Sequence, residues 1–284
     1  MGVGEFMEFL RKILEILDTQ MVEPLPYGWF HLMFWAIALG SAVLLCVLYK
    51  KGYIKNAKRV VFITAIAVII LEVYKMINFG FSYEDEIKYS FPWGSFPWQF
   101  CSIPMYAGFL AGLTRGKIHN ALCCFLATFA VFAGAAVMFY PGDVFTERVG
   151  INIQTMICHG SMITIGIFLY YTGYVKAELK TLLKAMPVFA SALAVAVALN
   201  EIGHVAGLTE DHFFNMFYVS RHEEGHLPVY SSVQEIVPYP WCFLIYILGF
   251  SLAAGIIVLL AMGMKKLAGL IVKQKGREKS DIVA

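Results

Sequence analysis

The sequence predicts an all-α polytopic membrane protein with about seven transmembrane helices, preceded by an N-terminal amphipathic interfacial helix. Of its 284 residues, 59% are hydrophobic and only 15% are charged, against about 45–50% and about 25% in soluble domains. The mean hydropathy is +0.68. A soluble chain of this length has too little interior to bury so much apolar surface. The composition therefore excludes a soluble or a disordered protein.

Seven apolar runs approach the ~20 residues that a helix needs to cross a bilayer, and the third run is the shortest. They are Trp29–Leu48, Val60–Phe79, Trp98–Leu113, Ala121–Tyr140, Asn152–Gly173, Leu182–Gly203 and Tyr239–Met262. We therefore expect a surface helix and linker over residues 1–27, one seven-span membrane domain over residues 28–263 and a basic cytoplasmic tail over residues 264–284.

The N-terminal segment from Glu5 to Thr19 carries apolar side chains at helical spacing between charged ones. The apolar stripe consists of Phe6, Phe9, Leu10, Ile13, Leu14, Ile16 and Leu17. Such a stripe is typical of a helix that lies on a membrane surface, and it lacks the pattern of a cleavable signal peptide. A helix that binds a partner protein is the alternative.

The number of Lys and Arg residues is high in every second connecting segment and low in the segments between them. The loop over Lys50–Arg59, the short loops around Lys117 and Lys180, and the C-terminal tail hold 16 of the 22. The N-terminal segment and the other three loops hold five, and Lys75 lies inside a span. The positive-inside rule therefore places the N-terminus outside and the C-terminus in the cytoplasm.

Polar and ionisable side chains share one depth in the outer half of the predicted spans. Such groups are costly in hydrocarbon, so each one indicates a functional site by default. They are Glu72, Lys75, Asn78, Gln99, Cys101, Gln154, His159, Asn200, Glu201 and His204. Plainer alternatives exist: Glu72 and Lys75, three residues apart, can form a structural ion pair. The last three residues can be the hydrated end of a helix, and His159 can be a satisfied buried histidine.

Of the six cysteines, Cys101 has the sequence context that best fits a thiol nucleophile. All six cysteines fall in apolar runs, where a cysteine is usually a small inert side chain. Cys101 lies early in a span that follows Pro97, where a helix N-terminus favours the thiolate, and Pro104 removes a backbone donor beside it. His159 lies at similar depth, because each residue rises about 1.5 Å. It can be the base that a thiol nucleophile needs.

Residues His222-Glu223-Glu224-Gly225-His226 match the spacing with which metalloproteases bind zinc through two histidines, the first glutamate being the base. The motif requires a helix, yet a glycine lies inside it and Pro228 follows it. These residues favour a solvated loop. Casual metal binding by the loop histidines and a zinc protease site are the alternatives.

Five short segments together resemble the YwaF-type integral membrane proteins of bacteria and their eukaryotic relatives, the transmembrane protein 164 acyltransferases. The segments, within roughly residues 60–262, are Leu71–Lys75, Trp98–Ile103, Cys158–Gly160, Phe214–Tyr218 and Val237–Trp241. The resemblance implies that Cys101, in its Gln-x-Cys-Ser stretch, and His159 form the catalytic pair. It also implies that an acyl-cysteine carries a fatty acyl group between phospholipids. The His222–His226 stretch is not part of the resemblance.

We therefore expect a membrane-embedded enzyme that transfers or hydrolyses acyl esters of phospholipids or lysophospholipids. Cys101 would attack the ester carbonyl with His159 as its base. Amide side chains would donate to the oxyanion, and a carboxylate would orient the imidazole. The supporting residues are expected among Glu72, Lys75, Gln99, Gln154, Asn200, Glu201 and Asn215.

The expected partners are membrane lipids, with no cofactor, no metal and no nucleic acid. The resemblance to bacterial proteins implies a bacterial cell membrane as the location. A transporter or receptor with a polar ligand site in the outer half of the bundle is an alternative, although it would need a pathway through the apolar inner half. A zinc protease acting through His222, Glu223 and His226 is a third.

Overall fold

A computed structural model describes residues 2–283 apart from residues 84, 143, 212, 224–226 and 228–229, and apart from the side chains of residues 3, 210, 211 and 271–283. The last three residues of the His222–His226 motif therefore lie outside the described residues, as does His212. The elements are α1 Val3–Leu17, α2 Trp29–Lys50, α3 Ala57–Gly80, β1 Phe81–Ser82, β2 Lys88–Tyr89, η1 Trp93–Ser95, η2 Phe100–Ser102, α4 Ile103–Leu113, α5 Gly116–Ala127, α6 Phe129–Phe139, α7 Val149–Tyr171, α8 Leu179–Val205, α9 Leu208–Asp211, η3 Met216–Tyr218, α10 Tyr230–Ile236 and α11 Tyr239–Val283.

The predicted all-α membrane fold is confirmed. Within the described residues, six helices are long and apolar enough to cross a membrane. The shorter apolar segment Phe100–Leu113 lies where the sequence predicts the third span. The fourth predicted span consists of α5 and α6, which are separated at Thr128 with φ −126° and ψ −84°. The Thr128 hydroxyl donates to the Cys124 carbonyl at 2.8 Å, a local bond of the kind that bends helices.

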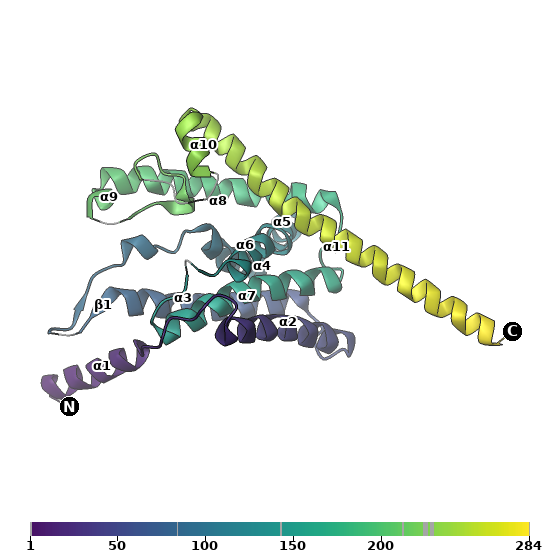
Figure 1. The fold of residues 1–284 in the computed structure, drawn as a ribbon, viewed down its shortest axis with the longest axis horizontal. Coiled ribbons are helices and arrows are strands. Elements are labelled where there is room, and N and C mark those ends of the chain that lie inside the picture. The colour runs from purple at the N-terminus through teal and green to yellow at the C-terminus, as the bar shows by residue number, and fades with distance from the viewer. Residues whose placement is uncertain are drawn as a thin grey trace.

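Helix α7 is the central element of the bundle. It packs against α2, α3, α5 and α6, while α4 packs against α3 and α5, and α8 packs against α5 and α11. In the view of Figure 1, α2, α3 and α7 lie on one side, α8, α10 and α11 lie on the other, and α4 to α6 lie between them. The polar residues of α7 are thus enclosed by other helices.

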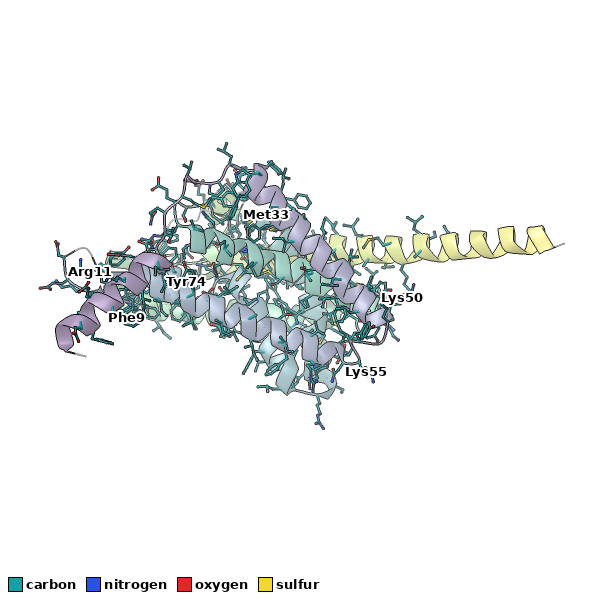
Figure 2. The ribbon with its side chains drawn as sticks, turned by 90° about the horizontal axis from the view of Figure 1, so that it is seen from below. Phe9, Arg11, Met33, Lys50, Lys55 and Tyr74 are labelled. Carbon is teal, nitrogen blue, oxygen red and sulfur yellow. The ribbon has the colours of Figure 1, made fainter. Side chains whose placement is uncertain are left out.

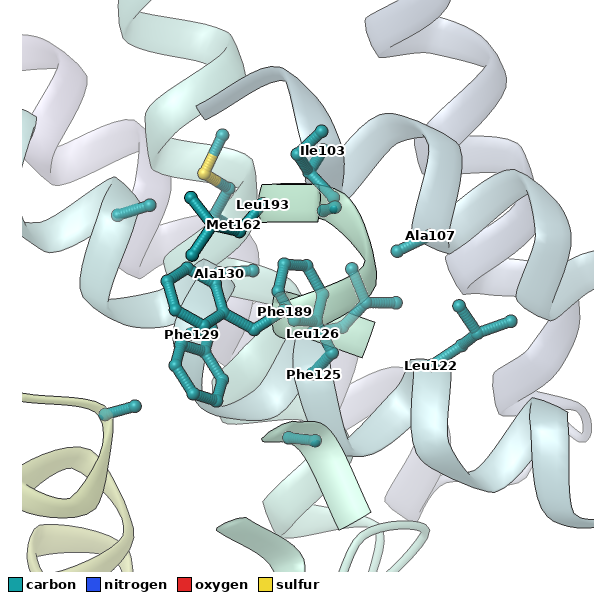
Figure 3. Close-up of a cluster of buried hydrophobic side chains, with 14 of the residues drawn as sticks. Ile103, Ala107, Leu122, Phe125, Leu126, Phe129, Ala130, Met162, Phe189 and Leu193 are labelled. Atoms are coloured by element: carbon teal, nitrogen blue, oxygen red, sulfur yellow. The ribbon is translucent and has the colours of Figure 1, made fainter. Parts of the chain in front are cut away.

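The interior is held by close packing of aromatic and small side chains. Figure 3 shows its centre, where the rings of Phe129 and Phe189 stack with centroids 4.5 Å apart. Phe125 continues the stack at 5.9 Å from Phe129. Lipid tails are as apolar as leucine, so such packing, rather than exclusion of water, holds helices together in a bilayer. The outward faces carry exposed apolar side chains, such as Ile63 and Ile70 of α3.

The two ends of the bundle differ in charge. Figure 2 shows Lys50 and Lys55 together at one end, which we call the basic end, and Phe9 and Arg11 at the opposite end, which we call the α1 end. The basic loop and the N-terminal helix therefore lie at opposite ends of the spans, as the alternation of Lys and Arg predicts. The sides of the membrane that these ends face stay a prediction.

Helix α1 has the expected amphipathic character. Leu14 is buried, whereas Phe9 and Ile16 are 56% and 72% exposed. The end of the helix is anchored to the bundle, because the Tyr74 hydroxyl donates to the Leu17 carbonyl at 2.7 Å. The following Asp18 forms an ion pair with Arg148 at 3.0 Å. At the other terminus, α11 continues as a helix past residue 263, so the segment expected as a basic tail is helical.

Candidate active site

The polar layer contains a compact group on α3 and α7. Lys75 forms an ion pair with Glu72 at 2.5 Å, the contact that their spacing on one helix face predicts. The second carboxylate oxygen of Glu72 accepts a hydrogen bond from Nε2 of Gln154 at 3.2 Å, and the same amide lies 3.5 Å from the Cys158 sulfur. Glu72 and Gln154 are buried. The Glu72 carboxylate is therefore held inside the bundle, where Lys75 balances its charge.

His159 has one engaged and one vacant ring nitrogen. Its Nδ1 atom lies 2.7 Å from the main-chain oxygen of Thr155. A carbonyl only accepts hydrogen bonds, so Nδ1 carries the proton and the lone pair of the neutral ring is on Nε2. Nε2 is buried and has no hydrogen-bond partner among the described residues. The main chain thus makes the orienting contact that we expected from Glu72 or Glu201.

Helices α6 and α7 are in close contact at the level of His159. Gly134 of α6 lies against the main chain of α7, and a Cβ atom at this position would come within 2.5 Å of the His159 carbonyl oxygen. Real Cβ atoms essentially never approach so closely, so any larger residue would push α6 and α7 apart. Glycine at residue 134 therefore keeps the two helices close at the level of the imidazole.

Cys101 lies in η2, the short 3₁₀ turn that begins α4. Pro104 follows in the first turn of α4, a position where proline costs no hydrogen bond. The η2 turn contacts α6, the helix that packs against α7 at the level of His159. No hydrogen bond joins this thiol to Nε2 of His159 in the described part of the chain.

Gln99 and Asn200 hold a loop that folds back into the bundle. Gln99 donates to the Asn215 carbonyl and accepts from the Phe217 amide, both at 2.9 Å. Asn200 accepts from the Met216 amide at 2.7 Å and donates to its carbonyl at 3.0 Å. Both side chains therefore act as partners for a buried, non-helical main chain. Irregular backbone at membrane depth is tolerated where protein encloses it in this way.

Asn215, in the same loop, retains an unused donor. Its Oδ1 atom accepts from the Ser220 amide at 2.9 Å. Its Nδ2 atom is buried and has no hydrogen-bond partner in the part of the chain that the structure describes. A buried polar atom without a partner carries a substantial energetic cost, so this amide is the expected oxyanion donor that stays free to bind another group.

Glu201 belongs to a different cluster, at the end of α8. It pairs with Arg221 at 2.8 Å and with His222 at 3.2 Å. The His222 ring stacks on His204 with centroids 3.6 Å apart. These contacts engage Glu201, and none of them involves His159. Among the described residues, no three His, Cys, Asp or Glu side chains form a group that could hold a metal ion.

The contact that Thr155 makes with His159 is not visible in the residue types. The carbonyl oxygen of Thr155 fixes the proton on Nδ1 of His159. Every residue has a main-chain carbonyl, so the residue type at position 155 does not indicate this contact. The spacing of four residues within a helix is the signal that could have indicated the contact, because it places the carbonyl of one residue beneath the side chain of the other.

A comparison with protein families gives one match. The model described as the TMEM164 family matches residues 26–262 of the chain. This range begins just before α2 and ends within α11, so it includes Cys101, His159 and the loop that Gln99 and Asn200 hold. No curated protein matches the chain, and no solved structure matches it.

Proposed function

Because the chain belongs to the TMEM164 family, we propose that it is a membrane-embedded enzyme of lipid acyl esters, in which Cys101 is the nucleophile and His159 its base. The family resemblance noted in the sequence implies acyl transfer between phospholipids through an acyl-cysteine. The expected membrane domain of residues 28–263 holds the whole site. Phospholipids and lysophospholipids are the proposed substrates.

The observation that carries the proposal is the state of the His159 ring. Its Nδ1 proton is committed to the Thr155 carbonyl, while Nε2 is buried and has no partner. This is the arrangement that a general base requires, with one nitrogen fixed by an acceptor and the other available for a proton. The same carbonyl would stabilise the imidazolium that forms when Nε2 takes up the proton.

The reaction proceeds in two steps. In the first, Nε2 of His159 takes the thiol proton as the Cys101 sulfur bonds to the ester carbonyl carbon. The ester C–O bond then breaks, and the leaving lysolipid oxygen receives that proton. In the second, Nε2 takes a proton from a lysolipid hydroxyl, or from water, whose oxygen attacks the thioester. The C–S bond breaks and the thiolate regains the proton.

The oxyanion of each step needs donors that are not already engaged. Gln99 binds the 215–217 main chain and Gln154 binds Glu72, so we assign this role to Nδ2 of Asn215. The Ser102 amide already donates to the Gln99 carbonyl at 2.8 Å, so the Phe100 and Cys101 amides, which precede the first hydrogen bond of the turn, add donors beside the Cys101 thiol.

The site lies in the half of the bundle that is nearer to the α1 end, which the charge alternation predicts to be the outer half of the membrane. A lipid ester lies at the interface between headgroups and acyl chains. A nucleophile in the outer half of the spans is therefore nearer to such a carbonyl than one in the inner half.

The test is the formation of an acyl-enzyme. Full-length protein in lipid nanodiscs is incubated with phospholipid carrying a labelled acyl chain. Hydroxylamine, which cleaves thioesters, should then remove the label from the wild type. Cys101→Ala should give no label, and His159→Ala should acquire it at least about a thousandfold more slowly. The double variant should be no worse, because the two residues act as a unit.

The matched control is Cys242→Ala. Cys242 is buried, and its thiol donates to the Val237 carbonyl at 3.1 Å, so the variant should be labelled like the wild type. Equal labelling of Cys101→Ala and the wild type would refute the proposed nucleophile. Normal labelling of His159→Ala would refute the proposed base.

A further inference from the structure

The positive charge of the basic end comes from four segments of the chain. They are residues 50–59, residues 114–117, residues 172–184, which include the loop between α7 and α8, and residues 262–270 of α11. Together they hold twelve Lys and Arg residues and one acidic residue, Glu178. Lys184 lies 4.0 Å from the Glu178 carboxylate, so even this acid has a basic partner. The basic end therefore carries a large excess of positive charge.

Side-chain contacts bring the four segments together. The Lys58 ammonium donates to the Thr114 carbonyl at 2.6 Å, which joins the first segment to the second. The His119 ring lies 2.6 Å from the Tyr174 hydroxyl, which joins the start of α5 to the α7–α8 loop. In that loop, Ala177 lines a groove whose other walls come from α11. The charges thus form one surface rather than four separate loops.

Helix α11 leaves the bundle at this end. Ala254, Val258 and Ala261 are buried, whereas Leu267 and Leu270 are 59% and 55% exposed. Figure 1 shows the helix crossing the other helices obliquely and continuing past them. The segment after Ala261 therefore presents apolar side chains that no other part of the described chain covers.

The groove opens where α11 leaves the bundle, and its volume is about 660 Å³. Small-molecule sites have roughly 300–1,000 Å³. Its α11 wall includes the apolar Met262 and Leu270 and the charged Lys265 and Lys266. A Cβ atom at Gly263, which also lines the groove, would meet no atom within 4 Å. The groove therefore offers two ammonium groups beside an open apolar wall.

The two lysines lie at the depth of lipid headgroups. Trp241, near the start of α11, is 63% exposed, as in the aromatic belt at a membrane interface. Lys265 follows 24 residues later in the sequence, or about 36 Å along the helix. This length exceeds the hydrocarbon thickness of about 30 Å, and the oblique course of α11 takes up part of the difference. Lys265 and Lys266 therefore reach the opposite headgroup region.

We propose that this groove binds one anionic phospholipid from the leaflet at the basic end of the bundle. The ammonium groups of Lys265 and Lys266 bind its phosphate, since lysine acts towards phosphate as a strong point charge. Its glycerol and the first methylenes of its acyl chains contact Met262 and Leu270. A zwitterionic lipid carries its own cation, which the surrounding Lys and Arg residues repel. The inference is independent of the proposed reaction.

The first experiment compares two lipids by native mass spectrometry of the full-length protein in mild detergent. The probes are phosphatidylglycerol, which is anionic, and phosphatidylcholine, which is zwitterionic. We expect one phosphatidylglycerol to bind more tightly than any phosphatidylcholine. The double variant Lys265→Gln, Lys266→Gln should weaken its binding about thirtyfold, because each lysine near an anionic lipid contributes about fivefold. Equal affinities for the two lipids in the wild type would overturn the proposal.

The matched control removes the same charge elsewhere on the basic end. Lys50 and Lys51 are exposed, and neither lines the groove. The double variant Lys50→Gln, Lys51→Gln should change the affinity for phosphatidylglycerol less than about threefold, because salt screens charges that do not contact the lipid. Equal losses in the two double variants would overturn the groove as the site.

The second experiment fills the groove without changing its charge. Gly263→Trp places an indole in the open space and should abolish the tight binding of phosphatidylglycerol. Gly249→Trp is the control, because Gly249 lies on the same helix, also meets no atom within 4 Å and does not line the groove. Unchanged binding in folded Gly263→Trp protein would overturn the proposal. Glycerol phosphate at the same concentration should not displace the lipid, and displacement would overturn the assignment of a lipid as the ligand.

Discussion

The buried ion pair between Glu72 and Lys75 allows a quantitative test of how the polar layer is held. The side chains are 9% and 19% exposed and their charged atoms lie 2.5 Å apart. We consider Glu72→Met, Lys75→Met and the double variant, since methionine keeps the length of each side chain and removes its charge. Gln154 donates to the same carboxylate, so it loses its partner whenever Glu72 is replaced.

The expected magnitudes follow from these contacts. Each single variant leaves one buried charge without its partner and should destabilise the fold by about 3–5 kcal/mol. The double variant leaves no unpaired charge, because an apolar pair can replace a buried ion pair at little cost. It still leaves the Gln154 amide without its acceptor, which costs about 1–3 kcal/mol. The double variant should thus be more stable than either single variant, with a coupling energy of at least about 3 kcal/mol.

The assay is reversible unfolding by a denaturing detergent in mixed micelles, followed by near-ultraviolet circular dichroism. The surface pair of Glu8 and Lys12, with side chains 70% and 67% exposed, provides the matched control, and its removal should cost at most about 1 kcal/mol. Single variants as mild as this control, or a double variant equal to the sum of the singles, would refute the reasoning.

Three further predictions concern the helix contact at the site, the orientation and the N-terminal anchor. Gly134→Leu should reduce acylation at least about a hundredfold, because it displaces the helix that carries the base; Gly40→Leu, where a Cβ meets no atom within 4 Å, should not. A cysteine at Ser82 should react with an impermeant maleimide in intact cells and a cysteine at Asn56 should not; the reverse result would overturn the orientation. Asp18→Asn should speed hydrogen exchange of the amides in α1 without changing that of α7; equal exchange in the two proteins would mean that the ion pair does not hold the helix.

Much of the fold follows from patterns that are local in the sequence. Apolar runs of about 20 residues mark the spans because the bilayer sets their length. The ion pair of Glu72 and Lys75 is also a local feature, because the spacing of three residues places both side chains on one helix face. The N-terminal helix is equally visible, since Phe9 and Leu14 belong to one apolar stripe. These features depend only on neighbouring residues.

Other features depend on pairings that no local pattern records. Gln99 and Asn200 were expected near the chemistry, yet both bind the main chain of the 215–217 loop. Gln99 lies more than a hundred residues from that loop in the sequence. The orientation of His159 is similarly hidden, because its partner is the carbonyl of Thr155 and every residue type has a carbonyl. Only the packed structure shows which donors of the polar layer are already engaged.

The shortness of the third span has a consequence for how the protein is made. At about 1.5 Å per residue, Phe100–Leu113 is about 21 Å long, whereas the hydrocarbon core is about 30 Å thick. The buried loop around Asn215 lies beside the Phe100 end of this segment and is held there by Gln99. During synthesis the ribosome delivers that loop more than a hundred residues after Cys101. Cys101 therefore reaches its final surroundings only after residue 217 has been synthesised, so the proposed site is completed late in the synthesis of the chain.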